Sequence, residues 1–280
     1  MSPQYPRLIP PPIQDMSDFI GATPLLRLWN LGTRDDLEVY GKLELFNPAG
    51  SAKDRTARSL LRDAMASGRV REGSLVVESS SGNLGIALAR ACRLEGVRFL
   101  CIVDARTNRS AVTAMKAYGA QVEVIWEPDP DLGDLLATRR RRVAQILAEV
   151  PGAVNLNQYE NPANPRAHRE GTMAEIADAL DGDVDELFVA TSTTGTISGC
   201  AGYCAEHGLS TRLTAVDAMG SVLFGGQPGR RLIPGFGAGV EPPLAKDLRL
   251  DGVIRVDDTQ TVAGCWRTSP GFWPTTTSIS

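Results

Sequence analysis

Short apolar runs rich in β-branched residues alternate with amphipathic helical stretches through most of this chain. Strands that alternate with helices build parallel sheets with helices on both faces, so the sequence predicts an α/β fold. The predicted strands are residues 38–45, 74–78, 99–103, 121–125, 186–190 and 211–216. Predicted helices begin near Lys53, Gly82, Asn108, Asp131, Arg166 and Gly195.

The length of 280 residues predicts two domains, at roughly 150 residues each. A helix predicted over 131–150 ends at Pro151-Gly152, and a loop rich in asparagine and proline follows it. We therefore place a domain boundary near residue 155, with an N-terminal α/β domain over 1–155 and a C-terminal α/β domain over 156–280.

The charge and cysteine content exclude several classes of protein. A net charge of −4 gives no general attraction to nucleic acid or to an anionic membrane. The chain shows no apolar run of about 20 residues and no signal sequence at its start, which predicts a cytoplasmic protein. The five cysteines and two histidines have no metal-ligand spacing, so no metal site is expected.

Four consecutive arginines, at 139 to 142, lie on the helix predicted over 131–150. The apolar residues of this helix follow helical spacing and would occupy one face of it. The sequence predicts that the arginines form the solvated face rather than a nucleic-acid surface.

A lysine lies at the start of the first predicted helix, directly after the strand predicted over 38–45. Pro48 and Gly50 turn the chain, and Ser51 is a candidate N-cap, which places Lys53 in the first helical turn. The helix dipole and partial burial both favour a neutral amine, the form that attacks a carbonyl carbon. Lys53 is therefore a candidate nucleophile, although an exposed lysine that begins a surface helix would have the same local sequence.

The strand predicted over 74–78 ends in a run of small hydroxyl residues and glycine. Free backbone N–H groups at the start of the next helix can bind a carboxylate, and Asn83 is placed to point over the same cleft. A site for an amino-acid carboxylate is predicted at Ser80, Ser81, Gly82 and Asn83. A plain turn with serine caps would look similar.

A third loop, in the second half of the chain, follows the apolar run 187–190. Hydroxyl groups and backbone N–H groups at a helix start form a phosphate site without any cationic side chain. The residues of this predicted phosphate loop are Ser192, Thr193, Thr194, Gly195 and Thr196. The loop lacks the lysine of a Walker A motif, and the glycines at 235, 237 and 239 precede a proline-rich segment rather than a helix.

The order of the three loops resembles the cysteine synthase and cystathionine β-synthase family of pyridoxal-phosphate enzymes, which have fold type II. Residues 47–55 look like the family's cofactor-lysine motif, and residues 80–83 look like its carboxylate loop. Residues 157–159 and 161–165 resemble its interdomain cleft segment. Matches at 21–25 and 235–237 extend the resemblance from about residue 20 to about residue 265.

The resemblance implies a two-domain fold of tryptophan synthase β type, each domain a mostly parallel sheet flanked by helices, with residues 1 to about 45 crossing to the second domain. It implies pyridoxal 5'-phosphate held as an imine on Lys53, with its phosphate on residues 192–196 and its ring oxygen near Asn83. It also implies that Gln158 and Tyr159 close over an amino-acid substrate bound by residues 80–83. A homodimer that acts on small amino acids is expected.

The Ser-Thr-Thr-Gly form of the phosphate loop, with residues 216–221 and 230–235, resembles one branch of this family more closely. That branch performs a β-replacement that joins O-phospho-L-serine to L-glutamate, giving N-(2-amino-2-carboxyethyl)-L-glutamate, towards 2,3-diaminopropionate in siderophore and antibiotic pathways. Both substrates are anionic, so Arg230 and Arg231 are candidate substrate contacts, unless the pair is only solvent-exposed beside a turn. The alternative is a sulfhydrylase acting on O-acetylserine or O-phosphoserine, which needs no second carboxylate site.

From about residue 266 the sequence departs from the family pattern. The family continues with a helix, a glycine-serine segment that faces the pyridine nitrogen and a closing helix, whereas residues 266–280 show neither a helical period nor a serine-glycine turn. The sequence predicts a second domain that is atypical after residue 265 and truncated. A third hypothesis follows, in which the chain is a catalytically impaired relative that acts as a binding protein.

Overall fold

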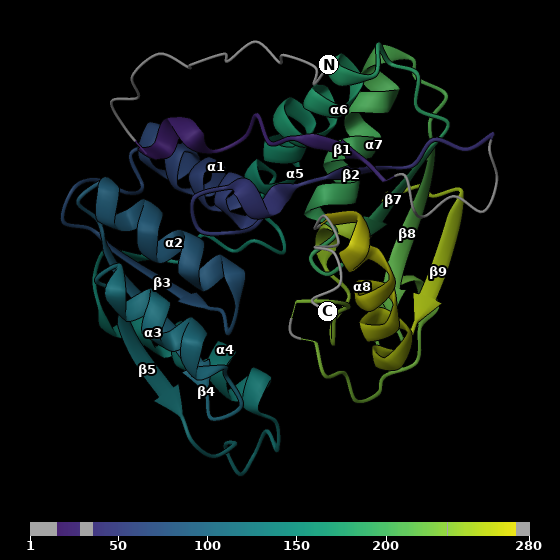
Figure 1. Cartoon of the computed structure of the whole chain (residues 1–280). Helices are drawn as coiled ribbons and strands as arrows, with labels where there is room; N and C mark the ends of the chain where they lie inside the picture. The colour runs from purple at the N-terminus through teal and green to yellow at the C-terminus, as the bar shows by residue number, and fades with distance from the viewer. Residues whose placement is uncertain (1–15, 29–35, 234, 273–280) are drawn as a thin grey trace, which may run out of the picture.

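The computed structural model describes residues 16–28, 36–233 and 235–272. Two parallel sheets with their helices form the two sides of the molecule (Figure 1). Among the helices in these ranges, none combines the length and apolar character that a membrane span requires.

The first sheet has the strand order β5-β4-β3-β6, and all of its strands are parallel. Its strands are β3 (Leu75–Ser79), β4 (Arg98–Asp104), β5 (Gln121–Ile125) and β6 (Ala153–Val154). Its helices are α1 (Lys53–Ala66), α2 (Asn83–Leu94), α3 (Arg109–Ala117) and α4 (Leu135–Glu149). Val76 packs in the core with α1, α2 and α3, whereas its neighbour Val77 packs against Val143 and Ile146 of α4. Because adjacent strand residues face opposite sides, helices cover both faces, as the sequence predicts.

The second sheet has the order β7-β8-β9 and is also parallel. It consists of β7 (Glu186–Ala190), β8 (Arg212–Ala218) and β9 (Gly252–Val256), with α7 (Gly195–His207) and α8 (Asp258–Phe272) beside it. A helical segment precedes β7, made of α5 (Ala163–Ala167), the π-helical turn η3 (His168–Met173) and α6 (Ala174–Ala179). Met173 packs with Cys200, Cys204 and Leu213, which joins this segment to α7 and β8.

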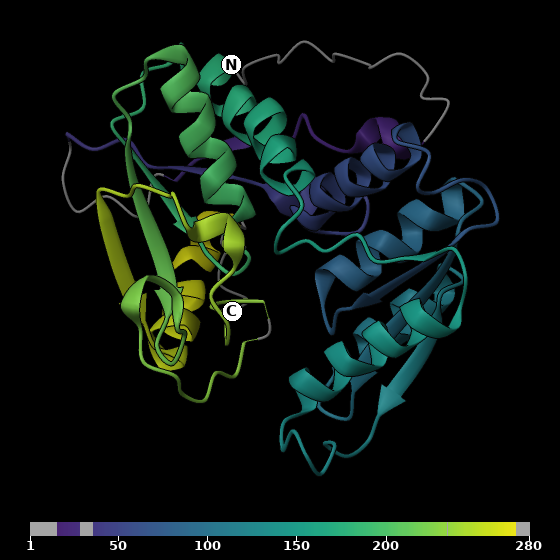
Figure 2. The same ribbon diagram turned by 180° about the vertical axis from the view of Figure 1, so that it is seen from behind.

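A short antiparallel ribbon, β1 (Leu25–Arg27) with β2 (Tyr40–Lys42), precedes α1. Both views show it running beside α6 and the second sheet rather than beside the first (Figures 1 and 2). Ala22 N donates to Glu175 Oε1 of α6 at 2.9 Å, and Lys42 Nζ lies 2.6 Å from Glu175 Oε2. The short turns η1 (Met16–Phe19), η2 (Glu44–Phe46), η4 (Leu223–Gly225) and η5 (Pro243–Ala245) complete the described elements.

Several predicted bounds need correction. The strand predicted over 38–45 is extended only at Tyr40–Lys42, because Glu44–Phe46 forms a 3-10 turn. The helix predicted from Asp131 begins at Leu135, where Asp134 caps it by accepting a hydrogen bond from Ala137 N at 2.7 Å. The helix predicted near Arg166 begins earlier, at Ala163.

The expectation that no helix lies beyond residue 265 is wrong, because α8 continues to Phe272. The strand β9 was not predicted either. Residues 273–280 of the predicted atypical tail lie outside the described residues. The predicted α/β fold with parallel sheets flanked by helices is confirmed, whereas the domain boundary near residue 155 stays a prediction.

Candidate active site

The turn before α1 holds Lys53 at the first helical position. Gly50 supplies the left-handed backbone of the turn, with φ of 84°. The Asp54 carboxylate accepts a hydrogen bond from Ala49 N at 2.7 Å, and Lys53 N donates to Ser51 Oγ at 3.3 Å. Ser51 therefore lies one residue before the cap position, and its hydroxyl still satisfies a backbone N–H at the start of the helix.

The amine of Lys53 lies in a partly buried environment. Burial lowers its pKa from the ordinary value, which enlarges the neutral fraction at neutral pH. Burial, with the nearby positive charges of Lys53 and Arg55, also holds the pKa of His168 well below its ordinary value. The site therefore contains a lysine of lowered pKa and a neutral buried histidine.

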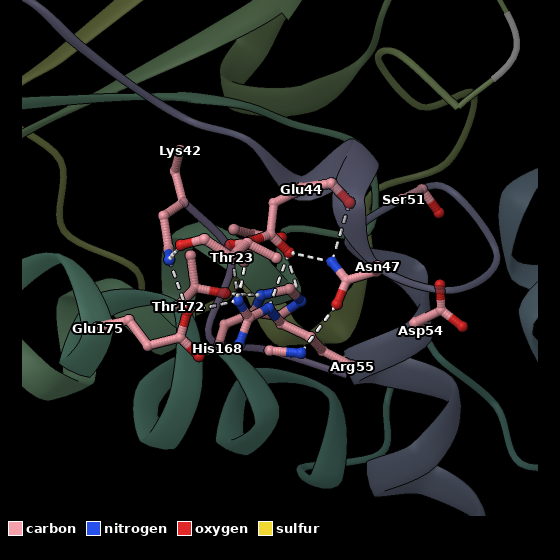
Figure 3. A network of polar contacts seen from close by, with 12 residues as sticks. Thr23, Lys42, Glu44, Asn47, Ser51, Asp54, Arg55, His168, Thr172 and Glu175 are labelled. Carbon is pink, nitrogen blue, oxygen red and sulfur yellow. Dashed lines mark hydrogen bonds and ion pairs between the residues drawn. The ribbon is translucent and has the colours of Figure 1, made fainter. Parts of the chain in front are cut away.

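Arg55, two residues further along α1, is the centre of an ion-pair network (Figure 3). Its guanidinium is 2% exposed and lies 2.8 Å from Glu44 and 2.6 Å from Glu175. Lys42 contacts Glu175 as well and donates to the carbonyl of Thr23. Burial alone would raise the pKa of Glu175, but the hydrogen bonds from Arg55 and Lys42 lower it to about 2. The network fixes the lysine helix against the ribbon and α6.

The predicted carboxylate loop joins β3 to α2. Ser80 is buried, its Oγ accepts a hydrogen bond from Gly85 N at 3.0 Å, and its carbonyl accepts one from Cys101 Sγ at 3.1 Å. A Cβ on Gly85 would lie 3.0 Å from the Ser80 carbonyl and 2.5 Å from the terminal methyl of Met115, so a larger residue there would require Met115 to shift. Ser81 is half-buried and Asn83, the first residue of α2, is exposed.

Arg139 lies against this loop, which corrects the expectation of four solvated arginines. Its side chain is 9% exposed and contacts Asp104 at 3.2 Å, and its Nη1 donates to Ser81 Oγ at 3.0 Å. The contact with Asp104 lacks hydrogen-bond geometry at Nε, so the guanidinium keeps a free donor among the described residues. The spacing of 139 from the buried Leu135 and Val143 is four residues on each side, the one sequence signal that could have placed it on the inner face.

The predicted phosphate loop joins β7 to α7. Thr194 has a left-handed backbone with φ of 61° immediately before the helix, and its Oγ1 donates to the Thr193 carbonyl at 2.7 Å. Gly237 N donates to the Thr191 carbonyl at 2.8 Å, which brings the late glycine segment against the loop. The helix that follows has 13 residues, so backbone N–H groups, hydroxyls and the helix dipole meet at its start.

Asn164 and His168 connect this loop to the lysine helix. Asn164 lies in the predicted cleft segment over 161–165 but was given no role of its own, and sequence reasoning missed His168. Thr56 Oγ1, one turn beyond the lysine, donates to Asn164 Oδ1 at 3.2 Å and lies 3.1 Å from His168 Nε2. Asn164 Nδ2 lies 3.2 Å from Thr193 Oγ1, and His168 Nε2 lies 3.3 Å from Thr196 Oγ1. Two buried polar bridges therefore bring the first and third predicted loops together.

The predicted cleft segment is held at a bend. Gln158 is buried, and its carbonyl accepts a hydrogen bond from Asn164 Nδ2 at 2.7 Å. Asn157 has a left-handed backbone with φ of 47°, and its Oδ1 accepts a hydrogen bond from Tyr159 N at 3.3 Å. Leu244 N donates to the Tyr159 carbonyl at 3.4 Å, so the segment also contacts the second half of the chain.

Charged groups from both halves act on Tyr159. Burial raises the pKa of its phenol and Glu78 raises it further, whereas Arg139, Arg231 and Arg140 lower it. Burial also raises the pKa of Glu78 to about 7, so this carboxyl carries only part of its charge near neutrality. The net effect raises the pKa of Tyr159, so its phenol stays neutral near pH 7 while three arginines from both halves of the chain act on it.

The two arginines predicted as substrate contacts differ in their surroundings. Arg231 is half-buried, donates to the Phe236 carbonyl at 2.9 Å and is one of the charges that act on Tyr159. Arg230 is exposed. The role of each in substrate binding stays a prediction.

Comparisons with known proteins agree with this arrangement of loops. Residues 16–269 match a family model described as pyridoxal-phosphate dependent enzyme. The chain is 45% identical over 250 residues to N-(2-amino-2-carboxyethyl)-L-glutamate synthase of Ralstonia nicotianae, an alignment that covers 89% of this chain and 74% of the relative.

Two solved structures are similar as well. The O-acetylserine dependent cystathionine beta-synthase from Helicobacter pylori aligns with a TM-score of 0.84 and 28% identity, over 93% of this chain and 84% of that one. O-ureido-L-serine synthase aligns with a TM-score of 0.80 and 31% identity, over 89% of this chain and 77% of that one.

Proposed function

Because the chain belongs to the pyridoxal-phosphate dependent enzymes, we propose that it catalyses β-replacement on an O-activated L-serine. The proposed substrates are O-phospho-L-serine and L-glutamate, and the products are N-(2-amino-2-carboxyethyl)-L-glutamate and phosphate. The name of the 45% identical relative gives this product. The names of the two similar structures give O-acetylserine and O-ureido-L-serine, which are both serines substituted on oxygen.

The residues present fit pyridoxal 5'-phosphate. Lys53 offers an amine of lowered pKa for the cofactor aldehyde, and residues 192–196 offer hydroxyls and N–H groups at a helix start for its phosphate. We assign Asn83, exposed at the start of α2, to the ring oxygen. When bound, the cofactor supplies the electron sink for chemistry at the α-carbon of the substrate.

We assign the substrate α-carboxylate to the N–H groups and side chains of residues 80–83, with Gln158 beside them. Lys53 Nζ removes the α-proton, because burial favours the neutral amine that accepts it. Fixing the carboxylate holds the α-carbon at one distance from that amine, which turns proton transfer into a local step.

The buried position of Arg139 beside the carboxylate loop is the main support for an anionic first substrate. A buried arginine is costly unless anions satisfy its donors, and its contact with Asp104 leaves the Nε donor unused. Ser81 brings this cation to the carboxylate loop, and Arg231 adds a second positive charge from the other half of the chain. A phosphate ester can use both charges, whereas the neutral acetyl ester of O-acetylserine needs neither.

The test pairs each first substrate with each nucleophile and identifies the product by mass spectrometry. We expect the glutamate adduct and free phosphate from O-phospho-L-serine, and Arg139→Met should lower kcat/KM for this ester about tenfold or more relative to O-acetyl-L-serine. Arg141→Met, from the same arginine run, is the matched control. Cysteine as the only product would support the sulfhydrylase alternative, and no product from any pair would support the binding-protein alternative.

We further propose that the protein is a cytoplasmic homodimer that acts on small amino acids, with its product leading to 2,3-diaminopropionate for a siderophore or an antibiotic. The division into domains at about residue 155 is part of the same proposal. Limited proteolysis near residues 151–165, followed by mass analysis of the fragments, tests the division.

A further inference from the structure

We propose that Asn164 is a positioning residue that couples the phosphate loop to both the lysine helix and the substrate segment. Its side chain touches neither the reacting atoms nor the residues assigned to the substrate carboxylate loop. This inference rests on the proposed function, because the loops it connects are the assigned cofactor and substrate sites.

Asn164 is fully buried and uses both ends of its amide. Its Oδ1 accepts a hydrogen bond from Thr56 of α1 at 3.2 Å. Its Nδ2 donates to the Gln158 carbonyl at 2.7 Å and to Thr193 Oγ1 of the phosphate loop at 3.2 Å. One amide therefore links three segments that the sequence separates by up to 137 residues, from position 56 to position 193.

The first turns of α7 pack closely against Asn164 and its neighbours. A Cβ on Gly195, the first residue of α7, would lie 2.2 Å from Asn164 Oδ1. One turn later, a Cβ on Gly199 would lie 2.3 Å from the Pro165 carbonyl. Because α7 begins directly against the amide, a shift of its first turn displaces Asn164 as well.

The contacts of His168 agree with a Thr56 hydroxyl that donates to Asn164. Because the Thr56 hydroxyl donates its one proton to Asn164, its oxygen is the acceptor in the contact with His168 Nε2, 3.1 Å away. The neutral imidazole then carries its proton on Nε2, and its Nδ1 accepts from Thr172 Oγ1 at 3.0 Å. The network runs from His168 through Thr56 and Asn164 to the phosphate loop.

The coupling has a direct consequence for function. A phosphate group that engages Thr193 fixes its hydroxyl, and Asn164 passes that constraint to Gln158 and to the helix that begins with Lys53. Binding of the cofactor phosphate should therefore strengthen binding of an amino acid at a site that the phosphate does not touch.

Thr56→Val and Thr193→Val, singly and together, test the coupling. Each removes one hydroxyl at nearly constant shape, and Thr56→Ser and Thr193→Ser keep the hydroxyl as controls. Titrations measure the dissociation constant for pyridoxal 5'-phosphate and, in the loaded protein, for L-alanine, which has no β-leaving group. We expect each valine variant to weaken both ligands about tenfold, and the double variant to lose little more than either single one.

Two outcomes overturn the proposal. One is a Thr193→Val variant that binds the cofactor weakly but binds L-alanine as the wild type does. The other is a double variant whose loss is the product of the single losses, about 100-fold, because independent effects multiply. A wild-type chain that binds no cofactor would instead contradict the proposed function.

A measurement on the chain without cofactor tests the hydrogen-bond network independently of the proposed function. Nitrogen NMR of the two histidines, assigned with His207→Gln, reports the tautomer of His168. We expect a neutral ring protonated at Nε2. A proton on Nδ1 would leave Nε2 to accept from Thr56 or Thr196 and would overturn the hydrogen-bond direction assigned to this network, whether or not the cofactor binds.

Discussion

The two sides of the candidate site are held together by different kinds of contact. On the lysine side, charges dominate: Arg55 lies between Glu44 and Glu175, and Arg139 contacts Asp104. On the phosphate side, neutral hydroxyls and an amide pack against glycines that leave no space for a methyl group. The lysine side should therefore respond to pH and to loss of charge, and the phosphate side to added volume.

The sheets beneath the two sides differ as well. Helices cover both faces of the first sheet, and α4 buries Val143 and Ile146 against it. In the second sheet Phe188 is 56% exposed and Ile254 is 45% exposed, and no α8 side chain that the structure describes is buried. On this side, Met173 of the segment over His168–Met173 packs in a buried cluster with Cys200, Cys204 and Leu213.

Substitution of Lys53 should give the largest difference between the effect on turnover and the effect on cofactor binding. Lys53→Ala removes the proposed base and cofactor attachment, so turnover should fall by roughly 10³-fold or more. The phosphate loop is untouched, so binding of pyridoxal 5'-phosphate should weaken by much less than turnover. Steady-state kinetics and equilibrium dialysis measure the two effects, with the exposed Lys116→Ala as control. Equal losses in both would show that the two sides are not separable.

Loss of the central arginine should cause a large loss of stability at neutral pH. Arg55→Met removes the guanidinium that lies 2.8 Å from Glu44 and 2.6 Å from Glu175, and leaves Glu175 with Lys42 and Ala22 N, which should cost about 3 kcal/mol in the free energy of unfolding. Urea unfolding measures it. The matched control is Arg69→Met, whose side chain is 45% exposed and lies 3.4 Å from Asp63, and which should cost less than about 0.5 kcal/mol.

The ion pair between Arg55 and Glu175 should also make the stability of the fold depend on pH in the acid range. The pKa of Glu175 is about 2 in the folded chain, below the ordinary 4.5, so its carboxylate stabilises the fold above pH 4.5. That contribution is lost as the pH falls from 4.5 to about 2. Arg55→Met should lose much of this dependence, and an unchanged acid transition would contradict the assignment.

Glu78 should give the opposite pH dependence on the same side of the site. Its pKa is about 7 in the folded chain against an ordinary 4.5, so the stability present below pH 4.5 is lost as the pH rises through about 7. Glu78→Gln cannot ionise and should raise the free energy of unfolding at pH 8 on the order of 3 kcal/mol, with little change at pH 4. Glu95→Gln, at an exposed position, is the control for a carboxylate change. A gain of equal size at both pH values would exclude ionisation as its cause.

The phosphate side should show the smallest of these effects, and through volume alone. In α7, a Cβ on Gly199 would lie 2.3 Å from the Pro165 carbonyl, whereas one on Gly202 meets nothing closer than 3.5 Å. Gly199→Ala should destabilise the fold by about 2 kcal/mol, and Gly202→Ala should stabilise it by about 0.5 kcal/mol because alanine favours the helix. Thermal unfolding of both variants compares them, and equal shifts would remove the distinction between the two sides.

The local elements of the site could be predicted because each loop carries its own signal. The strand ends and helix starts around Lys53, Ser80 and Gly195 follow from apolar runs, turn residues and small hydroxyl residues. The strands Gln121–Ile125 and Glu186–Ala190 are confirmed at their predicted bounds for the same reason. The α/β class and the family resemblance are confirmed as well.

The buried polar residues could not be predicted in the same way, because their hydrogen-bond partners lie far away in the sequence. Asn164, His168 and Thr172 recur every four residues, which is a pattern for one helical face, but only Thr56 and the phosphate loop explain why that face is polar. Arg139 was assigned to the solvated face together with the three arginines that follow it, although it lies four residues from both Leu135 and Val143. The roles assigned to the site residues stay predictions.

The pairing of Arg55 with Glu175 also affects how the chain folds as it is made. The two residues are 120 positions apart, so at roughly 5 to 20 residues per second a ribosome needs about 6 to 24 s to extend the chain from one to the other. During that interval Arg55 has only Glu44 of its two carboxylate partners, because Glu175 has not yet been synthesised. The separation of 120 positions raises the contact order of the site, so the lysine side should be among the last parts of the chain to reach its native packing.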